Sequence, residues 1–259
     1  MLSKQEQLRF LENELTGIIS FLTEPGATKP GKKEIHDLRI NIKKIIALVE
    51  VNKIRGYDTG TLALHGMKYL FKTAGIIRNS QVIISNIIQL DSDEKKILRY
   101  HRDIIRQTSK KLVLDIPRHL KMVNDFRVEM RSRKLNTISS DLILLYHELK
   151  SEYLKKIFKE PLNPATLHEG RKQIKHILYL REMIRPSTAK MIPLHYGNLN
   201  KLQDLIGKWH DSAVLFDFVR EFNMGKKYKG LKTLAQKKKD QFDAIRAFRK
   251  DKNNEIFIP

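Results

Sequence analysis

The chain has 259 residues, of which 41% are hydrophobic, which is enough for a buried core and speaks against global disorder. Fifty Lys and Arg against 29 Asp and Glu give a formal charge of +21, which indicates a polyanionic partner: nucleic acid, an anionic membrane surface or a phosphate polymer. The lack of cysteine excludes disulfides, thiol catalysis and Cys-ligated zinc. No signal peptide, transit peptide or transmembrane segment is recognisable, which favours a cytoplasmic location.

Apolar residues recur at spacings of three and four, which predicts an all-α fold without period-two strands. The first helix contains Leu8 to Leu22 and ends at Pro25-Gly26, and the second runs from about Lys32 to Asn52. Asn163-Pro164 marks a later helix start, because Asn caps free amides and Pro fits the first helical position. Further helices are predicted near residues 60–74, 78–90, 92–110, 114–131, 139–159, 164–185, 195–206, 209–223 and 230–250.

Two separated segments of the chain repeat at a constant offset. The repeated residues are His36, Arg39, Ile42 and Lys43 with His168, Arg171, Ile174 and Lys175, and Leu70, Gly75, Ser80 and Val82 with Leu202, Gly207, Ser212 and Val214, each displaced by 132. An internal duplication therefore predicts two halves, residues 1–132 and 133–259, joined at a polar connection that includes Arg133 and Lys134. Each half has about the size of a four-helix bundle.

The repeated cations predict a basic face on one helix of each half. His at position zero, Arg at +3 and Lys at +7 lie above one another on a helix, opposite the apolar residues. Lys32 extends this face in the first half, and Lys44 and Lys172 flank it. Three turns span roughly 16 Å, the scale of several consecutive phosphates. The planar guanidinium of Arg donates two hydrogen bonds to phosphate oxygens, and Lys adds a compact charge.

The sequence resembles the CHAD domain family (conserved histidine α-helical domains). The resemblance rests on both His-x-x-Arg-x-x-x-Lys helices, on the segment Leu202 to Leu215, and on Lys68, Lys72, Gly75, Arg78 and Val82. It implies two four-helix bundles related by a pseudo-twofold axis, with basic helices meeting around a central positive surface. It also implies polyphosphate binding and a location on polyphosphate granules.

The predicted function is non-catalytic binding of inorganic polyphosphate, with a polyphosphate-metabolising enzyme as a further candidate partner. No catalytic residue, metal site or cofactor is predicted. The predicted polyphosphate-binding residues are Lys32, His36, Arg39, Lys43, Lys44, Lys68, Lys72, Arg78, His168, Arg171, Lys172, Lys175 and Lys201.

Nucleic-acid binding is the main alternative, because basic helices serve both kinds of polyanion. The sequence contains no helix-turn-helix, RRM or zinc-finger pattern, and no phosphate-binding P-loop. His210-Asp211 is compatible with a metal-dependent phosphohydrolase, with His195 as an upstream ligand, but no suitable last Asp follows. The last predicted helix, with Lys237, Lys238 and Lys239, is either a solvated capping helix or a contact for an acidic membrane.

Overall fold

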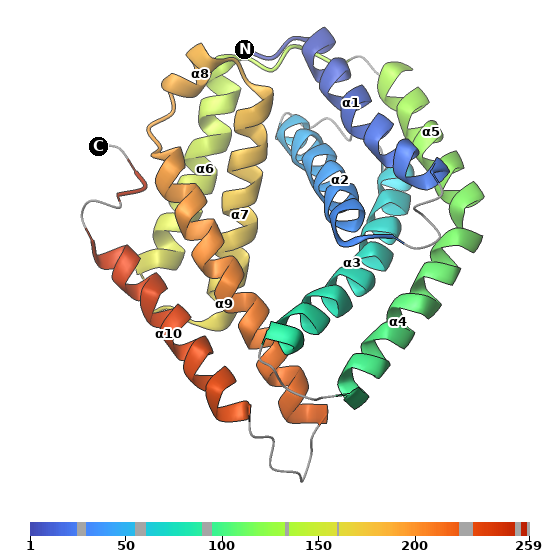
Figure 1. Cartoon of the computed structure of the whole chain (residues 1–259). Helices are drawn as coiled ribbons and strands as arrows, with labels where there is room; N and C mark the ends of the chain where they lie inside the picture. The colour runs from blue at the N-terminus through green and yellow to red at the C-terminus, as the bar shows by residue number, and fades with distance from the viewer. Residues whose placement is uncertain are drawn as a thin grey trace. The chain divides into compact units, whose positions relative to one another are not determined.

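The computed structural model describes residues 1–24, 30–54, 61–89, 95–132, 135–159, 161–222, 230–251 and 255–257. Within these ranges the chain forms ten α-helices and no named strand, which confirms the all-α prediction (Figure 1). None of the helices in the described ranges is long and apolar enough to cross a bilayer. The predicted connections at Pro25-Gly26 and at Arg133 and Lys134 lie outside the described residues.

The chain divides into two compact units. The first unit comprises Met1–Ser85, Asp93–Ile143 and Met183–Arg185. Its main helices are α1 (Lys4–Thr23), α2 (Lys32–Lys53), most of α3 (Thr61–Gln89), α4 (Lys95–Leu114) and α5 (Ile116–Ser132). α1 packs against both α2 and α5. The apolar side of α2 is buried except for Ile46, which is half-buried; its buried members include Ile35, Leu38, Ile42, Ile45 and Val49.

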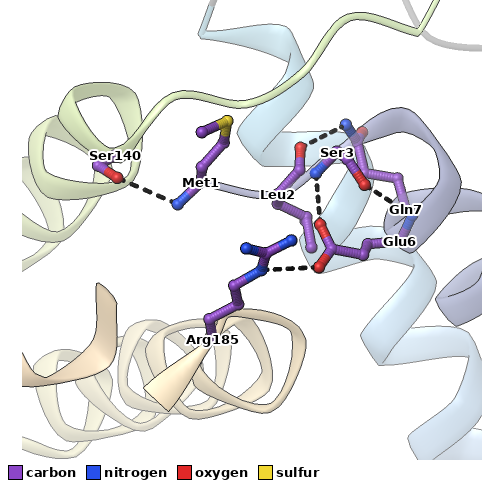
Figure 2. A network of polar contacts seen from close by, with 7 residues as sticks. All are labelled: Met1, Leu2, Ser3, Glu6, Gln7, Ser140 and Arg185. Carbon is purple, nitrogen blue, oxygen red and sulfur yellow. Dashed lines mark hydrogen bonds and ion pairs between the residues drawn. The ribbon is translucent and has the colours of Figure 1, made fainter. Parts of the chain in front are cut away.

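A network of polar contacts lies around the first residues of the chain and the start of α1 (Figure 2). The backbone amide of Ser3 donates to Glu6 at 2.7 Å, and the amide of Glu6 donates to Oγ of Ser3 at 3.2 Å, a capping box that begins α1. Nε of Arg185 donates to the same carboxylate at 2.9 Å. The backbone hydrogen bond from Ser3, its side-chain hydrogen bond and Arg185 lower the pKa of Glu6 to about 2. Leu2 exchanges two backbone hydrogen bonds with Ile138, so this segment joins α1 to the start of α6.

The second unit comprises Asn86–Ser92, Leu144–Glu182 and Pro186–Pro259. Its main helices are most of α6 (Ser140–Lys159), α7 (Pro164–Met183), α8 (Pro186–Lys190), α9 (Tyr196–Phe222) and α10 (Leu231–Lys250). α9 and α10 pack side by side. The predicted start of α7 is confirmed, because Oδ1 of Asn163 accepts a hydrogen bond from the amide of Thr166 at 2.9 Å.

Two helices are longer than predicted. α3 is continuous where the sequence predicts helices over 60–74 and 78–90, and α9 is continuous where it predicts helices over 195–206 and 209–223. In both cases the predicted interruption falls beside a glycine, Gly75 or Gly207, and that glycine is buried inside the helix. Glycine destabilises a helix by about 1 kcal/mol relative to alanine. At both positions an arginine from the neighbouring helix occupies the space that a side chain would fill.

Candidate polyanion-binding site

The basic face of α2 carries four of the predicted binding residues. Lys32 and His36 are exposed, whereas Arg39 and Lys43 are half-buried. Nζ of Lys32 donates to Oγ of Ser85 on α3 at 2.6 Å, so the first turn of α2 lies beside the later part of α3. The basic face of α2 thus lies beside α3, and its side chains become less exposed from Lys32 toward Lys43.

Arg39 reaches from α2 onto α3. Its Nη1 donates to the backbone oxygen of Phe71 at 2.7 Å, and its Cζ lies 3.9 Å from the centroid of the Phe71 ring. Nζ of Lys43 lies 5.5 Å from the same centroid. A Cβ on Gly75 would lie 2.5 Å from Nη1 of Arg39, so glycine provides the space for the guanidinium. The sequence places Arg39 opposite the apolar residues; the structure instead packs it on an aromatic ring.

The other predicted cations of the first unit differ in their surroundings. Lys68 and Lys72 on α3 are exposed and Arg78 is half-buried. Nζ of Lys44 lies 3.5 Å from a carboxylate oxygen of Glu14 on α1, and both side chains are largely shielded from solvent. Glu14 therefore offsets much of the charge of Lys44, whereas Lys68 and Lys72 present theirs to solvent.

The second unit contains the equivalent arginine contact. Arg171 on α7 approaches α9 so closely that a Cβ on Gly207 would lie 3.0 Å from its Nη2. Burial lowers the pKa of Arg171, while the charge of Asp211, followed by Tyr179 and Asp204, acts in the opposite direction. Nε of Arg171 is buried and has no hydrogen-bond acceptor among the described residues. The arginine–glycine contact thus occurs in both units at the offset of the sequence repeat.

A comparison with protein-family models assigns the chain to a family. The sequence model of the CHAD domain matches residues 65–220, more than half of the chain. The chain belongs to the CHAD domain family. CHAD domains are in general associated with polyphosphate binding. Within this chain, α2 with its basic face precedes the matched segment.

A solved structure supports the fold. The crystal structure of the CHAD domain from the plant Ricinus communis is similar to this chain with a TM-score of 0.70 and 14% sequence identity, covering 95% of this chain and 91% of that one. At this identity the likeness establishes the fold and nothing finer. No curated protein matches the chain.

The second unit of this CHAD domain contains a stacked pair of histidines. The rings of His168 on α7 and His210 on α9 lie 4.8 Å apart, centroid to centroid, at 24°. Burial lowers the pKa of His168, and the positive charges of His210, Lys172 and Arg171 lower it further. Nδ1 of His168 is buried without a hydrogen-bond partner in the described part of the chain.

The remaining predicted cations of the second unit lie on the same two helices. Lys172 on α7 is exposed, and its Nζ is 3.0 Å from a carboxylate oxygen of Glu169. Lys175 is half-buried, and Lys201 on α9 is exposed. Cations and carboxylates are therefore interspersed over this part of the second unit.

Sequence reasoning missed three residues of these sites. Phe71 supports Arg39, and Asp204 and Asp211 act on Arg171, as described above. The repeat offset marks the two acids as a difference between the halves, because Asp204 and Asp211 stand where the first half has Lys72 and Asn79. No cluster of three or more His, Cys, Asp or Glu side chains suited to a metal ion occurs in the described ranges.

Proposed function

We propose that this CHAD domain binds inorganic polyphosphate through cations of both units and catalyses no reaction on it. The observation that carries the proposal is the repeated contact between a basic helix and the next long helix, in which Arg39 lies on Gly75 and Arg171 on Gly207. Such a contact fixes a guanidinium before any ligand arrives, so less side-chain entropy is lost when phosphate oxygens bind.

The first unit offers the chemistry that a phosphate polymer requires. The hydrogen bond from Nη1 of Arg39 to the Phe71 carbonyl holds its planar guanidinium on α3, and the fork of N–H donors in a guanidinium matches the oxygens of a phosphate. The exposed Lys68 and Lys72 add compact positive charges that adapt to a flexible chain. α3, on which they lie, contains no acidic residue. A polymer with a negative charge on every unit thus meets cations without repulsion from that helix.

The proposal includes binding without hydrolysis. Among the described residues, the two arginine contacts bring together cations, an aromatic ring, glycines and the carboxylates of Asp204 and Asp211, and neither contains a nucleophile hydrogen-bonded to a base. The role that fits such a domain is to carry its chain, or an associated polyphosphate-metabolising enzyme, to the polymer. Its location in the cell would then be on cytoplasmic polyphosphate granules.

The test is a titration of the purified chain with long-chain polyphosphate and with duplex DNA, at equal phosphate concentration and near-physiological salt. We expect polyphosphate to bind at least about tenfold more tightly, a difference of about 1.4 kcal/mol. Equal or tighter binding of DNA would replace this proposal with nucleic-acid binding. Incubation of the same protein with polyphosphate, with and without Mg²⁺, should release no phosphate; release that is lost in Asp211→Asn would instead indicate a hydrolase.

A further inference from the structure

The exposed side of α4 carries a second set of cations that lies outside the site described above. All seven Lys and Arg residues of this helix are exposed, and Asp103 is its only acidic residue. Asp103 pairs with Arg106 at 3.1 Å, so it offsets one charge of the seven. The charges that α4 presents to solvent are therefore almost all positive.

Five of these cations form a straight line, here called the α4 basic face. Successive members are separated by four, three, four and four residues, so they lie on one side of the helix. At 1.5 Å per residue the line is about 22 Å long. The members are Lys95, Arg99, Arg102, Arg106 and Lys110.

The opposite side of α4 is fixed to the protein. Ile97 and Leu112 are fully buried, and Nδ1 of the buried His101 lies 3.1 Å from Oγ of Ser80 on α3. The apolar side of the helix is consequently used for packing and is not available for insertion into a membrane, which separates this surface from an interfacial amphipathic helix. The cations are displayed on a rigid support.

A cluster of rings and cations joins the end of α4 to the basic residues of α3. Nζ of Lys111 lies 5.8 Å and Cζ of Arg118 lies 5.6 Å from the centroid of the Tyr69 ring. Tyr69 is the neighbour of Lys68 on α3 and precedes Lys72 by one helical turn. Positive charge thus continues from the α4 basic face, through the α4–α5 corner, to the helix that receives Arg39.

We propose that the α4 basic face is a second polyphosphate-binding surface of the first unit, which extends the site on α2 and α3 for long polymers. This inference rests on the proposed function. A line of cations suits a linear polyanion. Sequence-specific DNA binding would need side chains that hydrogen-bond to base edges, and Gln107 is the one exposed amide on α4. Two binding segments on one unit favour long chains, because binding of the first segment raises the local concentration of the second.

The experiment compares long-chain polyphosphate with tripolyphosphate. The test variant replaces Arg99, Arg102 and Lys110 with Gln, which leaves the Arg106–Asp103 pair intact. The matched control replaces three exposed lysines of α10, Lys232, Lys239 and Lys250, with Gln. Both variants lose three charges, and Gln has nearly the helix propensity of Lys and Arg, so both should remain folded by circular dichroism.

We expect the α4 variant to bind long-chain polyphosphate about tenfold more weakly and to show a salt dependence smaller by about two in its logarithmic slope. Its affinity for tripolyphosphate should equal that of the wild type, and the α10 variant should retain wild-type affinity for the long chain. Equal losses in the two variants, or a loss of duplex DNA affinity with polyphosphate affinity retained, would overturn the inference. If the wild type bound no polyphosphate, the proposed function itself would fall; if it bound and the α4 variant bound equally, only the inference would.

Discussion

Arg39 in the first unit and Arg171 in the second occupy equivalent positions of the repeat, yet their surroundings differ. Nη1 of Arg39 donates to a backbone carbonyl, and its guanidinium lies on the Phe71 ring. Arg171 has a buried Nε without an acceptor among the described residues, and Asp211 and Asp204 contribute negative charge around it. The neighbours of the two arginines thus differ: a backbone carbonyl and an aromatic ring lie against Arg39, whereas carboxylates act on Arg171.

The two units also differ in the acidic residues of the helices that Arg39 and Arg171 contact, α3 and α9. α3 contains no acidic residue, whereas α9 contains four, two of which replace Lys72 and Asn79 of the first half at the repeat offset. Carboxylates that stabilise an arginine also repel a polyanion and compete with its phosphates for the same N–H groups. We therefore expect the first unit to contribute more of the polyphosphate affinity than the second, although both retain the repeated cations.

The sharpest test replaces each arginine with glutamine. Arg39→Gln should weaken polyphosphate binding by about 1.5–3 kcal/mol, because it removes charge-assisted hydrogen bonds to phosphate beside α3, a helix without acidic residues. Arg171→Gln should cost less, since Asp211 and Asp204 already compete with phosphate for the guanidinium of Arg171 in the wild type. Isothermal titration calorimetry measures both affinities.

Lys239→Gln is the matched control for this pair, because it removes one charge from an exposed position of α10. Its affinity should stay close to that of the wild type. Melting temperatures should fall in both arginine variants, since both side chains are packed against a helix. Equal losses of affinity would contradict the asymmetry, and a larger loss for Arg171→Gln would reverse it.

The two glycines provide a second test of the comparison. Gly207→Ala should raise the melting temperature by about 2–4 °C, because alanine gains about 1 kcal/mol in a helix and the 3.0 Å approach to Nη2 of Arg171 requires only a small shift. Gly75→Ala should gain less stability, because the new Cβ, 2.5 Å from Nη1 of Arg39, displaces the donor from the Phe71 carbonyl. Thermal denaturation and polyphosphate titration of the two variants check this order.

Binding should follow the same order as stability, with a severalfold loss for Gly75→Ala and little change for Gly207→Ala. If Gly75→Ala retained full affinity, the position of Arg39 on α3 would be unnecessary for binding. The basic face of α2 would then act through net charge alone.

The periodicity of the sequence predicted the helices, because it depends on local spacing along the chain, and the constant offset paired the two arginines that contact glycines. The continuous α3 and α9 were not predicted, since the penalty for a glycine within a helix is local and the arginine that occupies its space comes from another helix. For the same reason the ring beneath Arg39 could not be found from spacing. The offset of 132 pairs Asp204 and Asp211 with Lys72 and Asn79, but only the packing of α7 on α9 places these acids near Arg171. The α4 basic face was not predicted, because its cations are spaced along a helix rather than consecutive, and its continuity with α3 through Tyr69 depends on packing.

The smallest expected effect concerns the histidines of the second unit. His168 and His210 are stacked there, whereas the offset of 132 places His36 and Arg78 at these positions of the first half. The pKa of His168 is lowered from 6.5, mainly by burial, so the unfolded chain takes up a proton at a higher pH than the folded one. Folding stability from this residue is consequently retained above pH 6.5 and lost as the pH falls below it toward the lowered value.

His168→Gln should therefore lose less stability than the wild type between about pH 7.5 and pH 5.5, as measured by chemical denaturation at each pH. The wild type will also lose stability from the first unit in this range, because burial lowers the pKa of His101 and His119 as well. Only the difference between variant and wild type thus reports on the stacked pair. His36→Gln, at the equivalent and exposed position of the first half, is the matched control and should change the pH dependence less. Identical profiles for the two variants would show that the stacked pair adds no proton linkage, and the two units would then differ through their carboxylates alone.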